Sequence, residues 1–279
     1  MRRQKLVIDA VWSCVCLFMM LGGCAAPEKT TSPSPSPTVQ RTPVSPVPTQ
    51  PPLRVGMTPN YPPIVFKEQG HITGLEADFA QGIGAELGRP INMVELAWER
   101  LIPALQAGQI DVIMSGMSVT EARQRQVSFV QPYIRVGQMA LIRKSDRTNL
   151  GAPSLLYRTR KRVGYEAGTT GEIFVRDHLP DAQAVPVSSA DEGLNALRSG
   201  TIDVLIHDAT TIWRVDSDAA NTTLIGVFTP LTEEYLAWAV RQTDTDLHRE
   251  LEAILSQWRR TGRLQSLFRK WLSFQVRLN

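Results

Sequence analysis

The sequence predicts an α/β fold of two similar lobes built on mainly parallel sheets. From Leu53 onward, short apolar runs alternate with segments of helical periodicity, which is typical of βα units whose sheets are covered on both faces. Residues 104–114 and 196–206 also share an alanine, a leucine, a glycine and the run Ile-Asp-Val in the same register. This repeat indicates a duplicated lobe, and two such lobes imply a ligand cleft outside the carboxyl ends of their strands.

Each expected strand is a short apolar run, and each expected helix carries apolar residues at helical spacing. The strands span residues 53–57, 91–95, 112–115, 139–143, 162–165, 184–187, 204–207 and 236–240. The helices span residues 74–87, 99–107, 170–179, 190–198, 246–260 and 263–271. Ser189 and Glu192 form a capping box at the start of one helix. Both copies of the repeat place a glycine, suited to a left-handed helix end, before the strand.

The first 23 residues resemble an export signal. Basic residues precede an apolar run over residues 6–21 that is too short to span a membrane and ends in small residues. Leu21-Gly22-Gly23-Cys24 resembles a bacterial lipobox, in which the cysteine becomes the acylated N-terminus. An uncleaved anchor helix is the alternative, and Asp9 weakens both interpretations equally. Either one places most of the chain outside the cytoplasm.

Residues 24–52 are rich in Pro, Ser and Thr, with nine prolines from Pro27 to Pro52. Such a segment cannot bury a core and favours extended polyproline geometry, at ~3.1 Å per residue. We expect a tether that holds a globular head away from a membrane surface. An O-glycosylated stalk would have the same mechanical effect.

The composition narrows the classes of partner. The chain has 30 Lys and Arg against 27 Asp and Glu, but residues 53–279 hold 25 of each. The head is therefore neutral, and no nucleic acid is expected as a partner. All three cysteines, Cys14, Cys16 and Cys24, precede the head, so no disulfide is expected in it.

Several enzyme and metal classes lack their motifs. The sequence has no Gly-x-Ser-x-Gly elbow and no Walker glycine loop, and its four histidines are dispersed. We expect no metal, no cofactor and no catalytic residue.

Polar groups follow both copies of the repeat. The first copy runs into a hydroxyl-rich turn and then a helix start that carries Arg123. Backbone N–H groups, hydroxyls and a guanidinium together suit a carboxylate. The second copy runs into His207 and Asp208, which place an anion at the matching position. Taken singly, Arg123 is typical of a surface ion pair and Asp208 of a helix cap. Their matched positions favour a site for a zwitterion.

The head resembles family 3 of the extracytoplasmic solute-binding proteins, the polar amino-acid receptors of ABC importers. The order and spacing of several stretches carry the resemblance: Leu53-Arg54-Val55-Gly56, Asn60-Tyr61-Pro62-Pro63, residues 74–78, 98–105, 115–123, Gly168-Thr169-Thr170 and 203–208. It implies a type II periplasmic-binding-protein fold with two hinge strands, near residues 133–137 and 232–236. Lobe 1 would comprise residues 53–136 and 233–279, and lobe 2 residues 137–232.

The resemblance also implies how the ligand backbone is held. Arg123 would bind the α-carboxylate with help from the backbone of Ser118 and Thr170. Asp208 would bind the α-ammonium group. Ser115 and Gly116 would contribute a hydroxyl or carbonyl to the ammonium group, and Thr169 belongs to the same implied ligand-binding set.

Other positions would surround the ligand side chain. Tyr61 and Trp98 match aromatic rings that sandwich it, although core packing explains Trp98 equally well. Glu166 can approach the ligand tail, or else lies solvated beside Arg162. The His207-Asp208 pair resembles glutamine-type receptors, while the acid common in receptors for basic amino acids is missing at Thr58. A neutral amide or basic side chain is favoured over an acidic one.

The implied function is capture of a free amino acid by closure of the two lobes, for delivery to an ABC permease in the cytoplasmic membrane. We expect a monomer held at the membrane by its lipid anchor. Two alternatives stay open. One is an exported dehydratase for prephenate or arogenate, with Glu166 or His207 as general acid. The other is an amino-acid sensing module.

Overall fold

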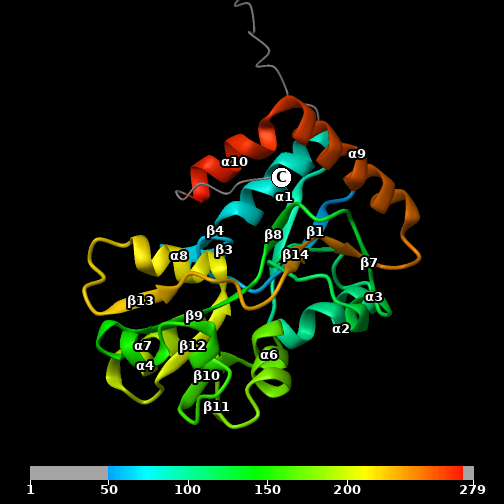
Figure 1. Ribbon diagram of the computed structural model, residues 1–279. Helices are drawn as coiled ribbons and strands as arrows, with labels where there is room; N and C mark the ends of the chain where they lie inside the picture. The colour runs from blue at the N-terminus through cyan, green and yellow to red at the C-terminus, as the bar shows by residue number, and fades with distance from the viewer. Residues whose placement is uncertain (1–49, 273–279) are drawn as a thin grey trace, which may run out of the picture. The chain divides into compact units, whose positions relative to one another are not determined.

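Two five-stranded sheets, one in each lobe, organise the chain in the computed structural model, which describes residues 50–272 (Figure 1). The sheet of the first lobe has the order β5-β1-β6-β15-β7. Strands β5, β1 and β6 are parallel, whereas β15 runs antiparallel to both β6 and β7. Its strands are β1 (Leu53–Met57), β5 (Ile91–Glu95), β6 (Val112–Ile113), β7 (Ser128–Phe129) and β15 (Ala239–Val240).

The sheet of the second lobe repeats this arrangement in the order β11-β10-β12-β9-β13. Strands β11, β10 and β12 are parallel, and β9 is antiparallel to β12 and β13. Both sheets are therefore mixed, with a parallel half made of the predicted βα units. The strands are β9 (Gln138–Arg143), β10 (Arg162–Glu166), β11 (Gln183–Val187), β12 (Val204–Asp208) and β13 (Leu224–Val227).

Two further strands, β8 (Ile134–Val136) and β14 (Glu234–Leu236), pair antiparallel in a sheet of their own. Strand β8 leads into β9 of the second lobe, and β14 leads into β15 of the first. They coincide with the segments predicted as hinges. The residue boundaries given above for the two lobes stay a prediction.

Helices cover both sheets. Around the first lie α1 (Leu75–Leu87), a 3₁₀ turn (Trp98–Arg100), α2 (Leu101–Gln106), α3 (Glu121–Gln124), α9 (Thr245–Thr261) and α10 (Arg263–Trp271). Around the second lie a 3₁₀ turn (Lys144–Asp146), α4 (Arg147–Leu150), α5 (Pro153–Leu156), α6 (Thr170–His178), α7 (Ala190–Ser199) and α8 (Ala209–Ser217). Half of the predicted capping box is confirmed, because the Ser189 side chain accepts a hydrogen bond from the Glu192 N–H. The Glu192 carboxylate instead accepts from the N–H and hydroxyl of Ser188. Within residues 50–272, no helix is both long and apolar enough to cross a membrane.

An aromatic cluster forms the core of the first lobe. The ring of Phe79 on α1 lies 5.2 Å from Tyr133, 5.4 Å from Trp238, 5.9 Å from Trp258 and 6.3 Å from Phe268, measured between centroids. These partners come from the hinge region and from α9 and α10, which lie beside α1 in Figure 1. Large buried aromatic areas of this kind stabilise a core strongly, so the C-terminal helices complete the first lobe.

The repeated Ile-Asp-Val has the same contacts in both lobes. Asp111 accepts hydrogen bonds from the backbone and guanidinium of Arg54 and lies 3.5 Å from Arg241. Asp203 likewise accepts from the backbone and guanidinium of Arg162 and from Arg143. Each aspartate thus fastens the start of its strand to a neighbouring strand through charge-assisted hydrogen bonds.

The expected elements differ from the structure at the strand ends. The strand expected over residues 236–240 is split between β14 and β15, because the Ala237 N–H bonds to Met117 where the chain passes from one sheet to the other. The strand expected over residues 112–115 ends at Ile113, before a turn with Gly116 at φ 66°. The sequence did not predict α8, β13 or the small sheet of β2 (Asn60–Tyr61), β3 (Val65–Glu68) and β4 (His71–Thr73).

The predicted signal at residues 1–23, Cys24 and most of the tether lie outside the described residues.

We expect Asp203→Asn to lower the free energy of unfolding at pH 7 by about 2 kcal/mol, the scale of hydrogen bonds to a charged group. Hydrogen bonds from Arg162 lower the pKa of Asp203 to about 2, although burial opposes this. A lowered pKa stabilises the fold above about pH 4, and the gain is lost as the pH falls towards 2. The deficit of the variant should therefore shrink over that range in urea titrations.

Asp181→Asn is the matched control, since Asp181 is exposed in the same lobe. It should change the stability by less than about 0.5 kcal/mol. Equal stability of Asp203→Asn and the wild type at pH 7 would contradict the stabilising role given to the Asp203 hydrogen bonds.

Candidate functional site

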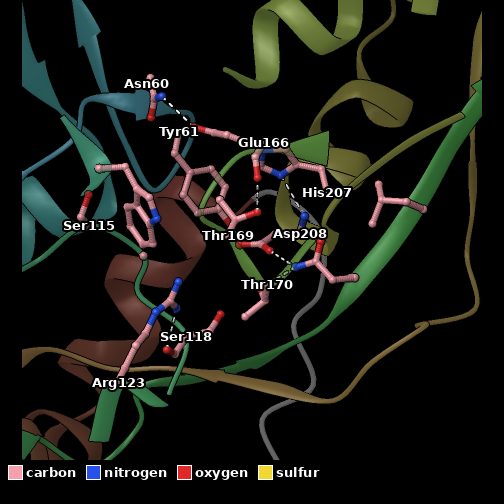
Figure 2. Close-up of a pocket in the computed structure, with 14 residues that line it drawn as sticks. Asn60, Tyr61, Ser115, Ser118, Arg123, Glu166, Thr169, Thr170, His207 and Asp208 are labelled. Atoms are coloured by element: carbon pink, nitrogen blue, oxygen red, sulfur yellow. Dashed lines mark hydrogen bonds and ion pairs between the residues drawn. The ribbon is translucent and has the colours of Figure 1, made fainter. Parts of the chain in front are cut away.

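A polar cleft lies between the lobes, at the carboxyl ends of β6 and β12 (Figure 2). It encloses about 490 Å³, counting the part that opens to solvent. All of the residues predicted from the sequence line it: Tyr61, Trp98, Ser115, Gly116, Ser118, Arg123, Glu166, Thr169, Thr170, His207 and Asp208. Asn60, Gln138 and Ile206 line it too and were not predicted.

The turn after β6 forms the floor on the side of the first lobe. Ser115 accepts a hydrogen bond from the Thr58 N–H through its hydroxyl, at 2.9 Å. Gly116 adopts φ 66°, and a Cβ atom there would lie 2.6 Å from Cε1 of Tyr61. Glycine is required at this position, because any larger residue would displace the tyrosine ring from the cleft.

Arg123 lies at one end of the cleft, on the short helix α3. Its Nη1 donates to the Ser118 carbonyl at 2.9 Å, and its Nη2 to the Gly168 carbonyl at 3.3 Å. The guanidinium carbon is 5.1 Å from the centre of the Trp98 ring, a cation–π distance. Burial lowers the pKa of Arg123, while the charges of Glu234 and Asp208 raise it. A guanidinium remains charged even so, which gives this end of the cleft a planar cationic donor.

Asp208 lies on the second lobe, where β12 finishes. The Tyr61 hydroxyl donates to its Oδ2 at 2.5 Å, and Gln138 Nε2 donates to its Oδ1 at 2.5 Å. Burial raises the pKa of Asp208, the charge of His207 lowers it, and that of Glu234 raises it. The cleft therefore carries an acceptor for a cation opposite the guanidinium of Arg123.

His207 and Glu166 lie side by side on the second lobe. His207 Nε2 is 3.3 Å from Glu166 Oε2, and His207 Nδ1 accepts from the Asp208 N–H at 2.8 Å. Because Nδ1 is an acceptor, this arrangement corresponds to the ring with its proton on Nε2, donating to Glu166. Burial lowers the pKa of His207, but the hydrogen bond to Glu166 and the charges of Asp208 and Glu166 outweigh burial. The pKa of His207 is therefore raised above its ordinary value. The other oxygen of Glu166 accepts from Asn60 Nδ2 at 3.0 Å.

Thr169 and Thr170 begin α6, whose N-terminus faces the cleft. The Thr169 side chain caps the helix by accepting from the Gly171 N–H at 3.2 Å. Helix N-termini carry partial positive charge and free N–H groups, which suit an anion. Trp98 Nε1 donates to the Gly168 carbonyl at 2.9 Å, so the loop before the helix touches the first lobe. Trp98 is therefore placed at the cleft, with Ile102 and other apolar neighbours behind it.

Two buried acids near the cleft were missed by the sequence analysis. Glu76, which is fully buried, accepts from the Gly116 N–H at 2.7 Å and from the Tyr133 hydroxyl at 2.6 Å. Glu234, on β14, accepts from the hydroxyls of Ser118 and Thr170. An acidic residue at a position predicted to be buried would have drawn attention to Glu76 or Glu234. The local sequence patterns did not predict that either position is buried.

A family model describing bacterial extracellular solute-binding proteins, family 3, matches residues 53–274. The chain belongs to this family. The predicted family and its type II two-lobed fold are thereby confirmed. Proteins of this family bind solutes outside the cytoplasm. Among the residues the structure describes, no group of three or more His, Cys, Asp or Glu side chains could hold a metal ion.

Individual relatives are consistent with membership of family 3. The chain is 28% identical over 210 residues to the ABC transporter glutamine-binding protein GlnH of Bacillus subtilis (strain 168), covering 73% of this chain and 74% of that protein. It matches holo ArgBP from T. maritima at 31% identity with a TM-score of 0.69, over 78% of this chain and 95% of that one. It matches an ancestral amino acid-binding protein, AncCDT-1, a precursor of cyclohexadienyl dehydratase, at 31% identity with a TM-score of 0.72, over 78% and 94%.

We expect Glu76→Gln to change how stability depends on pH. Burial raises the pKa of Glu76 to about 7, and the hydrogen bonds from Tyr133 and Gly116 oppose the rise. An acid whose pKa is raised by folding binds a proton that the unfolded chain has released, so the fold loses stability as pH rises from about 4.5 to about 7. Relative to the variant, the wild type should lose up to about 3 kcal/mol over this range.

Denaturant titrations at several pH values measure this difference. Glu250→Gln, at an exposed position of α9, is the control and should follow the wild type at every pH. If the free energies of unfolding of the wild type and Glu76→Gln differ by the same amount at every pH, Glu76 does not titrate between about pH 4.5 and about pH 7.

Proposed function

We propose that this family 3 protein is the substrate-binding component of an ABC importer and captures a polar amino acid with a neutral amide or basic side chain. The observation that carries the proposal is the pairing of Arg123 and Asp208 on facing walls of one cleft. A carboxylate matches the planar guanidinium and the N-terminus of α6. An ammonium group matches Asp208, which would exchange its bond from Tyr61 for one from the ligand.

The side-chain preference follows from the remaining polar groups. Glu166 offers carboxylate oxygens, and His207 and Asn60 offer hydrogen-bond partners beside them. An amide can both donate to Glu166 and accept from a neighbouring N–H, and a cation can pair with Glu166 directly. An acidic side chain would meet the like charge of Glu166 and is disfavoured. The glutamine-binding and arginine-binding relatives named above support this range of ligands.

A dehydratase for prephenate or arogenate is the second candidate, since one structural relative is a precursor of such an enzyme. It would use Glu166 or His207 as a general acid. The binding function is favoured because Glu166 already accepts hydrogen bonds from Asn60 and His207, and because Arg123 and Asp208 provide for both charged groups of a free amino acid. We therefore do not propose an enzyme.

The surroundings of the head are part of the proposal. The lipobox-like sequence before Cys24 supports an acylated N-terminus, and the Pro-rich segment supports a tether of residues 24–52. We propose a monomeric, lipid-anchored head outside the cytoplasm that delivers its amino acid to a permease in the membrane below.

We expect Arg123→Ala to weaken amino-acid binding by 100-fold or more, about 3 kcal/mol, because a bound carboxylate would lose a charge-assisted partner inside a desolvated cleft. The ligand is first identified by a thermal-shift screen of the twenty amino acids, since a compound that binds only the folded state raises Tm. Isothermal titration calorimetry then gives the affinity of each variant.

Arg125→Ala is the matched control. Arg125 ends the same helix, but its guanidinium is exposed and paired with Glu121. This variant should bind like the wild type. An unchanged affinity in Arg123→Ala would exclude the proposed mode of carboxylate binding.

We expect Glu166→Gln to reduce affinity for arginine and lysine by ~10-fold or more while affecting glutamine less, because the variant loses the charge that attracts a cation but keeps a hydrogen-bonding side chain. Competition calorimetry with these three amino acids gives the ratio. Glu250→Gln, far from the cleft on α9, should leave the ratio unchanged. Equal losses for all three ligands would show that Glu166 does not choose among side chains.

A further inference from the structure

Glu234 joins the two lobes through one carboxylate oxygen. It lies on β14 and is only 8% exposed. Its Oε2 accepts from the Ser118 hydroxyl at 2.7 Å and from the Thr170 hydroxyl at 2.7 Å. Ser118 belongs to the turn after β6 in the first lobe, whereas Thr170 is the first residue of α6 in the second. The same atom therefore binds both walls of the cleft.

The other carboxylate oxygen binds Glu234 to the segments that connect the two lobes. Its Oε1 accepts from the Thr232 hydroxyl at 2.7 Å, and that hydroxyl oxygen accepts from the Gln138 N–H at 2.8 Å. Ser118 is held against the same strand by a backbone bridge to Leu236. Three hydroxyl groups thus satisfy the carboxylate, and its negative charge acts on Arg123 through space. Glu234 is fixed on the side of the first lobe and reaches across to α6.

The contact with Thr170 continues through Gln138 to Asp208. Gln138 Nε2 donates to the Thr170 hydroxyl at 3.1 Å and to Asp208 Oδ1 at 2.5 Å. A continuous set of hydrogen bonds therefore runs from Ser118, near Arg123, to Asp208. Networks of this kind specify one arrangement of their members because each loss leaves a buried polar atom unpaired.

We propose that Glu234 is a positioning residue that holds the lobes in the closed arrangement and presents Ser118 and Thr170 to the ligand carboxylate. Movement of α6 away from β14 would remove one hydroxyl donor from a buried carboxylate, and that loss is costly. This contact therefore stabilises the closed arrangement even without a ligand. The role in ligand binding rests on the proposed function, whereas the effect on lobe closure does not.

Electron paramagnetic resonance distances between two spin labels test the effect on closure without any ligand. The full chain has only Cys14, Cys16 and Cys24, and replacing them with serine leaves labels at Gln81→Cys and Asp181→Cys as the sole attachment points. Both positions are exposed, one on α1 of the first lobe and one beside β11 of the second. We expect a short-distance population in the wild type, and we expect the ratio of closed to open molecules to fall about tenfold in Glu234→Gln, the effect of one hydrogen bond to a charged group.

Two further variants keep the result interpretable. Thr170→Val removes the donor while leaving Glu234 in place, and it should open the lobes to the same extent; combining it with Glu234→Gln should add little. Glu233→Gln is the matched control, because Glu233 is the exposed neighbour paired with Arg135 and Tyr235. Thermal denaturation checks that each variant is folded, and if Glu234→Gln is not, Thr170→Val alone decides.

The outcomes separate the inference from the proposed function. Distance distributions of Thr170→Val and Glu234→Gln that match the wild type would overturn the role of Glu234, whatever the protein binds. A shift to longer distances in both, with Glu233→Gln unchanged, supports it. If the lobes open as expected but no amino acid raises Tm, the proposed function fails and the role of Glu234 in closure stands. If amino acids bind equally well to both variants and the distances stay the same, the role of Glu234 in closure fails and the proposed function stands.

Discussion

The hydrogen bonds that fasten Asp111 and Asp203 to their arginines are the constraint on which the cleft depends. Each aspartate lies at the start of a strand, β6 or β12, and each strand ends at the cleft. The isoleucine before each aspartate packs on a glycine of the neighbouring strand, Gly56 or Gly164, where any side chain would clash. Charge and close packing at one end of the strand therefore determine where the polar residues at its other end emerge.

The duplication explains why the two walls of the cleft can carry opposite charge. The scaffold beneath is the same in both lobes, so the residues after each strand are free to differ. In the first lobe the strand is followed by a tight turn and a helix that carries Arg123, whereas in the second lobe the strand itself ends with His207 and Asp208. Binding residues on loops and strand ends that a rigid framework positions are a common arrangement. Here the framework also keeps a cation and an anion at matching positions.

The fold could be predicted from the sequence because its signals are local. Alternating strands and helices and the repeat predicted the two lobes, and the polar residues after the repeat indicated Arg123, His207 and Asp208. The other predicted lining residues followed from the resemblance to family 3. Gln138, Glu76 and Glu234 were not identified, because their importance comes from contacts with residues 32 to 116 positions away in sequence. The break between β14 and β15 was missed for the same reason: the chain changes sheet there through pairing with a distant segment.

The cleft also shows what a ligand would have to replace. Across it, Tyr61 binds Asp208, Asn60 binds Glu166, and Arg123 and Trp98 share the Gly168 carbonyl. Binding affinity is then the difference between the ligand's hydrogen bonds and these, not the sum of the ligand's own. A compound with a carboxylate but no ammonium group would leave Asp208 with only its protein partners, and one with an ammonium group but no carboxylate would do the same to Arg123. In the proposed binding mode, only a molecule that carries both charges at the right separation would improve on the hydrogen bonds of both residues at once, so the existing cross-cleft bonds would favour a zwitterion.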